Sequence, residues 1–388
     1  MIISHVKLRN WKNFRDAEAS LRDITYLIGA NATGKSNFLD VFRFLRDIAK
    51  VQGGGVQKAI ADRDGLTKIR CLHARQRPEI EIEVHLSERV DDVEPKWRYV
   101  LALKSEGKGA NRPIVASEQV YLNEGGRSRR LLNRPDAADL RDTERLTQTS
   151  LEQIQTNVDY REIADEFSSI TYLHLVPQLL KFGDFIGGRQ LENDPFGQAF
   201  LERLARTPEK TRNSRLRRIQ RALSKAIPQF EEIRFKRDDS SGRPHLEAKY
   251  THHRPHAGWQ REDQFSDGTL RLIALFWLLL DGDGFLLLEE PELSLNEEIV
   301  RNLPLLIDRV RRSTKRRSRQ ILISTHSQAL LENKGIDPRG VLRLERIGEG
   351  TSILAPTSED MQLLTAGLSA AEVLLPKAHP HRSREMAL

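Results

Sequence analysis

The sequence predicts an α/β protein built from a mixed sheet, an antiparallel β lobe and an inserted helical subdomain. A short apolar run at residues 24–28 leads through a glycine-containing loop to apolar positions at helical spacing between Lys35 and Lys50. This order predicts a strand, a loop and a helix. Residues 80–84 and 97–103 show the period of two that is expected of antiparallel strands. Two unbroken apolar runs late in the chain are typical of buried parallel strands.

These patterns predict one composite domain over residues 1–388. Its segments are residues 1–50 with the first strands and the loop, 51–125 as a β-rich lobe, 126–235 as a helical and polar insertion, 236–345 with the late apolar strands, and 346–388 at the C-terminus. Residues 126–170 are polar and rich in Arg and Asp, which favours solvated helix or loop. Residues 198–227 carry apolar positions partly at helical spacing, so we expect helices there.

The composition excludes several classes of protein. Of the 388 residues, 38% are hydrophobic, enough for a large core and too many for a wholly disordered chain. The single cysteine, Cys71, excludes an internal disulfide and fits a reducing compartment. The apolar stretch Leu272–Leu280 is too short to span a membrane, and the N-terminus lacks the pattern of a secretion signal. We therefore expect a cytoplasmic protein with no membrane part.

A phosphate-binding loop follows the first apolar run. Residues 29–36, GANATGKS, match G-x-x-x-x-G-K-[ST] and lie between a predicted strand and a predicted helix, as this motif requires. The glycines let the backbone curl with its N–H groups inward, Lys35 supplies an ammonium for the β- and γ-phosphates, and Ser36 supplies a hydroxyl for Mg²⁺. The expected cofactors are therefore ATP and Mg²⁺. The expected contacts with the nucleotide are Gly29, Asn31, Gly34, Lys35, Ser36 and Asn37.

Two acids end the first of the late apolar runs, in the sequence LLLEEPE. Hydrolysis of ATP needs an acid near the metal and a group that positions or activates water near the γ-phosphate. Adjacent carboxylates repel each other unless a cation or hydrogen-bond donors compensate, which disfavours a purely structural pair. We expect Glu289 to bind Mg²⁺, directly or through water, and Glu290 to act on the attacking water.

His326 follows the second late apolar run, in the sequence QILISTHS. A polar residue at the carboxyl end of a strand points into the crevice that binds ligands in open α/β sheets. Taken alone, such a histidine is as often structural as functional. Together with the loop and the acids, His326 is expected to contact the γ-phosphate.

A fourth motif, the sequence SDGT at residues 266–269, opens an apolar helix some twenty residues before the two acids. It has the form of a helix N-cap with free N–H groups, a ready anion site. Along the chain the four motifs follow one another in the order GANATGKS, SDGT, LLLEEPE and STHS. In this order they resemble those of the ABC-type ATPases of the RecF/SMC/OLD group, particularly the stand-alone RecF-like AAA ATPases. The resemblance covers residues 1 to about 330 and implies a P-loop NTPase fold of the ABC type.

This resemblance implies an ATP-dependent homodimer, in which two protomers meet head to tail around ATP. Ser266, Asp267 and Gly268 of one protomer would then cap the γ-phosphate held by the other. Asn10, Lys12 and Asn13 occupy the place of the segment that contacts the base and the α-phosphate in the family, although a basic strand edge is the alternative for this segment. Gln178 is the candidate for the glutamine that bridges the metal and the attacking water.

Three departures from the family limit what the resemblance implies. The SDGT turn differs from the LSGGQ form of transporters, which argues against a transporter motor. Asn296 stands where relatives commonly have His, which weakens the expectation of a cross-dimer loop after the acids. The chain between Gln178 and Ser266 is too short for a long coiled coil, and the chain after His326 is too short for an added nuclease domain.

Basic residues crowd two places, and the formal net charge of the chain is +7. These basic clusters comprise Arg212, Arg215, Arg217, Arg218 and Arg221 in the first, and Arg309, Arg311, Arg312, Lys315, Arg316, Arg317 and Arg319 in the second. Such clusters make salt-sensitive contacts with phosphate backbones, although solvated helix faces look the same. Double-stranded DNA is favoured, because no aromatic residues interleave with the clusters to stack single-stranded bases.

Three functions follow from these observations. The first is a DNA-associated ATPase in repair or genome maintenance, acting as an ATP-gated clamp. The second is the ATPase and sensor component of a bacterial anti-phage defence module, with a separate nuclease or toxin chain as effector. The third is a nucleotide switch that binds ATP without hydrolysing it.

Overall fold

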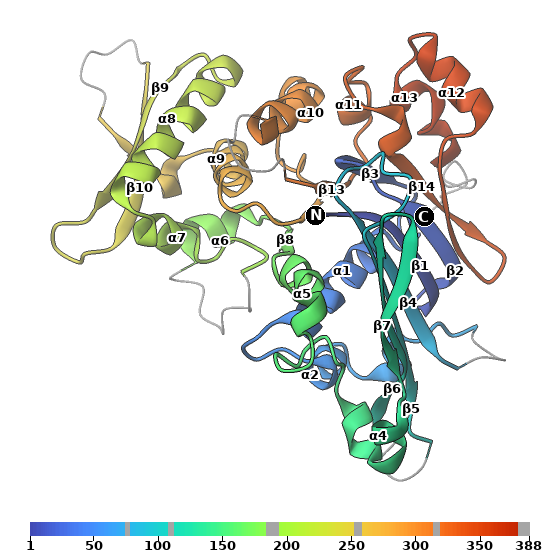
Figure 1. Cartoon of the computed structure of the whole chain (residues 1–388). Helices are drawn as coiled ribbons and strands as arrows, with labels where there is room; N and C mark the ends of the chain where they lie inside the picture. Colours follow the sequence, from blue (N-terminus) through green and yellow to red (C-terminus); the bar gives the residue numbers. More distant parts are fainter. Residues whose placement is uncertain (74–77, 108–111, 184–193, 252–257, 313–318, 379–388) are drawn as a thin grey trace, which may run out of the picture.

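The computed structural model describes residues 1–73, 78–107, 112–183, 194–251, 258–312 and 319–378 (Figure 1). Their strands form an antiparallel sheet of six strands, a mixed central sheet of six strands and a small sheet of three. The α/β class and the mixed sheet predicted from the sequence are confirmed. No helix among these residues combines the length and the hydropathy that a membrane span requires.

The antiparallel sheet has the strand order β2-β1-β4-β5-β6-β7. Its strands are β1 (Ile2–Trp11), β2 (Phe14–Ser20), β4 (Ile80–Ser87), β5 (Trp97–Ser105), β6 (Pro113–Glu124) and β7 (Arg127–Arg134). In β4, buried and half-buried side chains alternate, as the period of two in the sequence predicts. Strand β1 pairs with β4, and β2 pairs with the other edge of β1. Both strands therefore lie in this sheet with the β-rich lobe, and not in the sheet of the P-loop strand that follows them in the sequence.

Strand β7 corrects the expectation of helix or loop for the polar residues that follow position 126. It pairs with β6 at the edge of the antiparallel sheet. Most of its side chains are exposed or half-buried. An edge strand with a solvated face needs no apolar alternation, so its sequence carries no strand signal. After β7 the chain forms the short helices α4 (Ala137–Arg141) and α5 (Arg161–Ser168).

The central sheet has the order β15-β14-β3-β13-β12-β8. Its strands are β3 (Ile24–Ile28), β8 (Thr171–Leu173), β12 (Leu286–Glu289), β13 (Ile321–Ser324), β14 (Val341–Ile347) and β15 (Gly350–Leu354). All neighbours are parallel except β14 and β15. The carboxyl ends of β3, β12 and β13 therefore meet at one edge of the sheet, where α/β proteins bind ligands.

Both faces of the central sheet are buried, which explains the unbroken apolar runs. Leu287 and Leu322 join the core that lies between this sheet, α1 (Lys35–Ala49) and the antiparallel sheet. Leu286 and Leu288, their alternate neighbours on the other face, join a second core around α9 (Asp267–Leu280). Because successive residues of a strand point to opposite faces, every position here must be apolar.

The remaining helices are α2 (Val56–Ala61), α3 (Leu66–Ile69), α6 (Pro177–Phe182), α7 (Phe200–Arg206), α8 (Glu209–Ala226), α10 (Glu297–Arg312), α11 (Gln328–Leu331), α12 (Ser358–Thr365) and α13 (Ala370–Val373). In Figure 1, α6, α7 and α8 lie at the left with the small sheet, and α10 to α13 lie along the top. Helix α8 packs on the small sheet of β9 (Phe230–Arg237), β10 (Pro244–Tyr250) and β11 (Gln260–Arg261). The inserted subdomain is thus helical, as predicted, but it also contains this sheet.

Candidate nucleotide-binding site

The loop between β3 and α1 ends at Gly34, where the backbone turns tightly into the helix. Gly34 precedes α1 with φ 100°, a left-handed conformation that glycine adopts without steric cost. A Cβ atom at this position would lie 2.1 Å from Nδ2 of Asn13. The second glycine of the motif is therefore required both by backbone conformation and by the close approach of Asn13.

Lys35 lies inside this loop. Its side chain is largely buried, and its Nζ donates to the carbonyl oxygens of Gly29 at 2.8 Å and Ala30 at 3.0 Å. Burial lowers the pKa of Lys35 to about 8, against the opposite effect of the nearby carboxylates of Glu290 and Glu289. The loop's own carbonyls thus hold the ammonium, and the two acids are close enough to influence its pKa.

Ser36 and Glu289 are joined across the sheet edge. The Ser36 hydroxyl donates to Oε1 of Glu289 at 2.5 Å, although 253 positions separate them in the sequence. The second oxygen of Glu289 accepts from the hydroxyl of Tyr172 at 2.5 Å. Tyr172 lies in β8, the parallel neighbour of β12. Burial raises the pKa of Tyr172, and its contact with Glu289 adds to this, so the phenol stays a proton donor.

Glu290 turns away from the strand that ends at Glu289. Its φ of 45° is left-handed, which is uncommon for a residue with a side chain. Its backbone is held at both ends, because its N–H donates to the carbonyl of Ser324 at 3.0 Å and its carbonyl accepts from Nη2 of Arg271 at 2.8 Å. The carboxylate lies 3.6 Å from Nε2 of His326. Burial and then the neighbouring Lys35 lower the pKa of His326, which favours the neutral imidazole.

Glu292 supports the loop that carries His326. It is half-buried, accepts from the Thr325 hydroxyl at 2.5 Å and accepts from the His326 N–H at 3.3 Å. Burial raises the pKa of Glu292. Glu292, the last acid of the EEPE sequence, therefore positions the backbone of His326.

In the N-terminal segment, Asn13 contacts the loop, Lys12 lies beside it and Asn10 points into the protein interior. Asn13 donates to the carbonyl of Thr33 at 2.8 Å and to the Thr351 hydroxyl at 2.8 Å, and it accepts from Asn37 at 2.7 Å. Lys12 pairs with Asp40 at 2.6 Å and lines a cavity of about 550 Å³ beside the loop. Asn10 differs from our expectation, because it is buried and donates to the carbonyl of Glu79.

The SDGT turn caps α9, as its sequence predicts. Ser266 Oγ accepts from the N–H of Thr269 at 3.2 Å. The next residue, Asp267, pairs with Lys181 at 2.7 Å. Gln178 Nε2 lies 3.4 Å from Oδ2 of the same aspartate. The described contacts of Gln178 thus connect it with the turn, and none of them joins it to Ser36 or Glu289.

The chain matches one protein-family model, described as "AAA domain, putative AbiEii toxin, Type IV TA system", over residues 24–332. This segment contains the loop, the acids, the SDGT turn and His326. The chain belongs to this AAA family.

Solved structures similar to this AAA-family chain include heads of SMC proteins. One is an SMC head bound to the C-winged helix domain of ScpA, with 15% identity and a TM-score of 0.57 over 93% of this chain and 100% of that one. Another, from Pyrococcus furiosus, is an SMC head with an extended coiled coil bound to the C-terminal domain of ScpA. It has 12% identity and a TM-score of 0.52 over 94% of this chain and 98% of that one. At these identities the likeness establishes the fold, an ABC-type P-loop ATPase head. No curated protein matches the chain.

The oxygen atoms of this AAA domain fit Mg²⁺ held partly by a nucleotide. Among the described residues, no group of three or more His, Cys, Asp or Glu side chains could hold a metal ion by itself. The contact between Ser36 and Glu289 instead brings together one hydroxyl and one carboxylate. Mg²⁺ typically takes one or two protein oxygens and completes its shell with phosphate oxygens and water.

Several residues of the site escape prediction from the sequence. Tyr172 lies in a three-residue strand whose pattern gives no sign of a contact with the acids. Arg271 and Thr351 act through side chains that reach across the fold. Glu292 is the exception, since its place within EEPE is a signal that three acids gather there.

Proposed function

We propose that this chain binds ATP with Mg²⁺ at the carboxyl ends of β3, β12 and β13 and hydrolyses it. The strongest support is the 2.5 Å contact between Ser36 and Glu289, which joins the start of α1 to the end of β12. Lys35 inside the loop and Glu290 beside His326 complete the set of groups that phosphoryl transfer to water requires. The family membership supports the same activity.

In the proposed reaction, each group has a separate task. Lys35 binds the β- and γ-phosphates, while Ser36 and Glu289 hold Mg²⁺, which would neutralise charge on the phosphate oxygens. Tyr172 fixes the direction of the Glu289 carboxylate. Glu290 orients the attacking water and accepts its proton, and His326 contacts the γ-phosphate. Gln178 remains the candidate for the second contact with metal and water, which requires it to leave Asp267.

The nucleoside end of ATP is proposed to occupy the cavity beside the loop. This cavity of about 550 Å³ is lined by Lys12, Asn13, Asn37, Lys68 and Thr351, among others. Cationic and amide side chains of this kind can bind the α-phosphate and the edges of a base. Asn10 is left out of this proposal because its side chain is buried away from the cavity.

Two substitutions test the proposed ATPase. Lys35→Ala removes the ammonium from the loop, and we expect ATP binding to fall by at least about a hundredfold, as the loss of a buried charged partner implies. Glu290→Gln keeps the shape of the side chain and removes the base, so binding should persist while turnover stops. Equilibrium binding of a fluorescent ATP analogue and phosphate release measure the two effects.

Equal affinity for the ATP analogue in the wild type and in Lys35→Ala contradicts the proposal. Turnover that is lost in Glu290→Gln excludes a switch that binds ATP without hydrolysing it.

The proposed active form is an ATP-dependent homodimer. In the single protomer, the hydrogen bonds of the Ser266 hydroxyl with described residues stay within its own turn. A second copy placed head to tail would bring Ser266 and Gly268 to the γ-phosphate, as the family resemblance implies. Dimerisation of Glu290→Gln in the presence of ATP, measured by light scattering, tests this arrangement.

For the cellular role, we favour a toxin–antitoxin or anti-phage defence module over DNA repair. The description of the matching family names a toxin and a type IV toxin–antitoxin system, which supports a role with a separate nuclease or toxin chain. A cytoplasmic location remains our prediction for either role.

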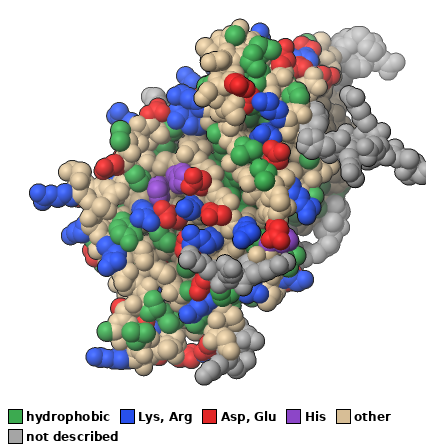
Figure 2. Space-filling view, turned by 90° about the vertical axis from the view of Figure 1, so that its right-hand side faces the viewer, with side chains coloured by type: hydrophobic (Ala, Val, Ile, Leu, Met, Phe, Trp, Pro, Cys, Tyr) green, Lys and Arg blue, Asp and Glu red, His purple; other side chains and the backbone are tan. Residues whose placement is uncertain are grey.

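The basic clusters lend less support to a DNA clamp than their sequence suggests. Arg212 lies over Phe235 at 4.1 Å, Arg215 pairs with Asp281 at 2.8 Å, and Arg319 is buried against backbone carbonyls. Arg311 pairs with Asp308 at 3.2 Å. Residues 315–317 lie outside the described residues. On the side of the molecule in Figure 2, Lys and Arg side chains are interspersed with Asp and Glu, which weakens the attraction for a phosphate backbone.

One experiment separates the two roles. Glu290→Gln is purified from native cells in the presence of ATP, and the captured material is analysed for protein and for DNA. Defence predicts a stoichiometric nuclease or toxin chain. Repair predicts duplex DNA whose binding is stimulated by ATP and weakened by salt.

A further inference from the structure

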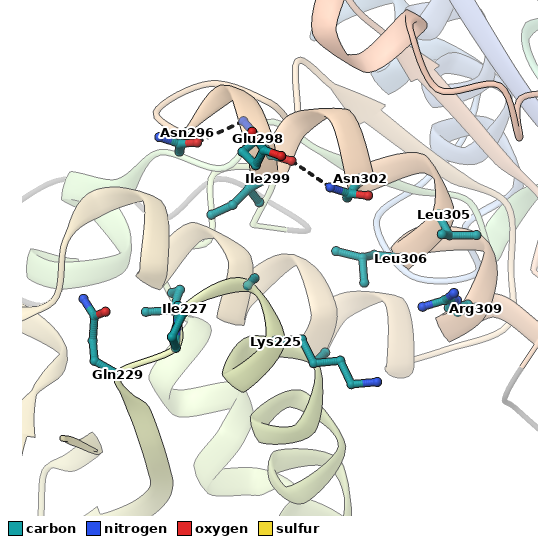
Figure 3. Close-up of a pocket in the computed structure, with 13 residues that line it drawn as sticks. Lys225, Ile227, Gln229, Asn296, Glu298, Ile299, Asn302, Leu305, Leu306 and Arg309 are labelled. Carbon is teal, nitrogen blue, oxygen red and sulfur yellow. Dashed lines mark hydrogen bonds between the residues drawn. The ribbon is translucent and has the colours of Figure 1, made fainter.

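A groove separates the inserted subdomain from the helix that follows the two acids. One wall is the last turn of α8 with the turn that leads into β9, and the other wall is the outer face of α10 (Figure 3). The groove has a volume of about 540 Å³. It lies apart from the loop, the acids and His326, none of which lines it.

The α10 wall presents apolar side chains where a solvated helix would be polar. Ile299 and Leu306, two turns apart, lie on the groove side of α10 (Figure 3). Leu305 is 39% exposed beside them. Ile227 faces them from the opposite wall. Asn302 is the polar residue between Ile299 and Leu306 on this wall. Apolar groups gathered along a groove with a few polar neighbours are typical of a surface that takes up the apolar face of a partner.

Two cations lie together at one end of the groove. Figure 3 shows Lys225 from α8 and Arg309 from α10 on the same side. Both are exposed, and neither side chain has a hydrogen bond or ion pair with another described residue. Among the described residues that line the groove, Glu298 is the one acid, and it lies near the other end, 3.6 Å from Arg301. The cationic end therefore complements carboxylates that none of the described residues supplies.

We propose that this groove docks an amphipathic helix of a partner protein, with apolar residues against α10 and Asp or Glu beside Lys225 and Arg309. The wall from Asn296 to Arg309 is about 20 Å long at the helical rise of 1.5 Å per residue, which fits a partner helix of three to four turns. A nucleic acid would use the two cations but would leave the leucines in water. The apolar wall therefore favours protein.

Helix α10 also connects this groove with the nucleotide site. Its first turn is capped by Asn296, whose Oδ1 accepts from the N–H of Glu298 at 2.9 Å. Asn296 ends the short segment that follows the acids. A helix docked in the groove therefore contacts the element that continues from Glu289 and Glu290. Docking itself does not depend on the proposed ATPase activity.

The test uses the full chain without nucleotide and two designed helical peptides of the same length. Both carry leucines on one face, and one has Glu on the flanks where the other has Lys. We expect the Glu peptide to bind at least about tenfold more tightly by fluorescence anisotropy, since opposite charges meet across the groove. The double variant Lys225→Glu with Arg309→Glu should reverse this preference. Arg217→Glu, which removes an exposed cation of α8 outside the groove, should leave it unchanged.

A second variant tests the apolar wall. Leu305→Ser changes a side chain that is 39% exposed. It should weaken binding of the Glu peptide about tenfold, while the chain still prefers the Glu peptide to the Lys peptide. Equal binding of the two peptides, or a preference that survives the double charge reversal, overturns the proposal. The proposal is also overturned if neither peptide binds and a 20-base-pair duplex binds through Lys225 and Arg309. If the chain self-associates and Leu305→Ser abolishes this self-association, the groove binds a second copy of the chain. This outcome also overturns the proposal.

Discussion

Glu289 is held by both of its carboxylate oxygens before any ligand is considered. One oxygen accepts from Ser36 and the other from Tyr172, each at 2.5 Å. The Tyr172 ring is itself fixed by the guanidinium of Arg43, which lies 4.3 Å from its centroid. A carboxylate on a flexible side chain gains a defined direction from such a partner.

Tyr172→Phe removes this hydroxyl alone and should weaken the site for Mg²⁺. We expect the Mg²⁺ concentration that half-saturates binding of a fluorescent ATP analogue to rise about tenfold, within the range for loss of an outer partner of a metal ligand. Binding of the analogue in EDTA should not change, because Lys35 and the loop are untouched.

The matched control is Tyr121→Phe, which removes a hydroxyl that donates to Gln119 on β6. It should change neither quantity. An unchanged Mg²⁺ midpoint in Tyr172→Phe would show that the phenol has no part in metal binding. Failure of the wild type to bind the analogue at all would instead count against the ATPase proposal.

At the scale of elements, the start of α9 is packed directly on the segment after the acids. A Cβ atom on Gly268 would lie 2.6 Å from the carbonyl oxygen of Ser294. Ser294 itself has a left-handed φ of 63°. The backbones of the turn and of this segment thus approach too closely for a side chain between them.

Gly268→Ala should therefore displace Ser294 and its neighbours. We expect a loss of about 1–3 kcal/mol in unfolding free energy, the usual cost of overpacking, and a larger loss of ATP-dependent dimer, because the displaced segments both face the proposed partner. Chemical denaturation and light scattering measure the two. Gly258→Ala is the control, since its Cβ meets no atom within 4 Å. Dimerisation as strong as that of the wild type would contradict a role for this contact in assembly.

At the scale of the whole molecule, the proposed site is divided between two copies. Ser266 must come from one protomer and Lys35 from the other if the sandwich forms. A C2 dimer of this kind contains two equivalent composite sites.

Complementation between two inactive variants tests this division. Ser266→Asp keeps a residue that caps helices but places a negative charge toward the γ-phosphate, and Lys35→Ala disables the loop. Each alone should be inactive. An equal mixture should recover about a quarter of wild-type turnover, because half of the dimers are mixed and each mixed dimer has one intact site. A mixture as inactive as its components, although mixed dimers form, contradicts the head-to-tail arrangement.

The sequence by itself determined the features that depend on neighbours along the chain. The spacing in GANATGKS predicts a loop between a strand and a helix, and the unbroken runs before Glu289 and His326 predict strands buried on both faces. Parallel strands share one carboxyl edge, so the convergence of Lys35 with the acids followed from these local patterns. The cap at Ser266 is equally local.

Only the tertiary structure decided which distant side chains meet. Tyr172 reaches Glu289 because β8 pairs with β12, and Asn13 reaches Thr351 across most of the chain. The same packing turns Asn10 inward, occupies Arg215 and Arg319 with internal partners, and makes a strand of the polar residues after 126. The spacing of apolar side chains along the sequence indicates whether a segment is a helix or a strand. Contacts between residues far apart in the sequence depend on how these elements pack, and no local pattern contains this information.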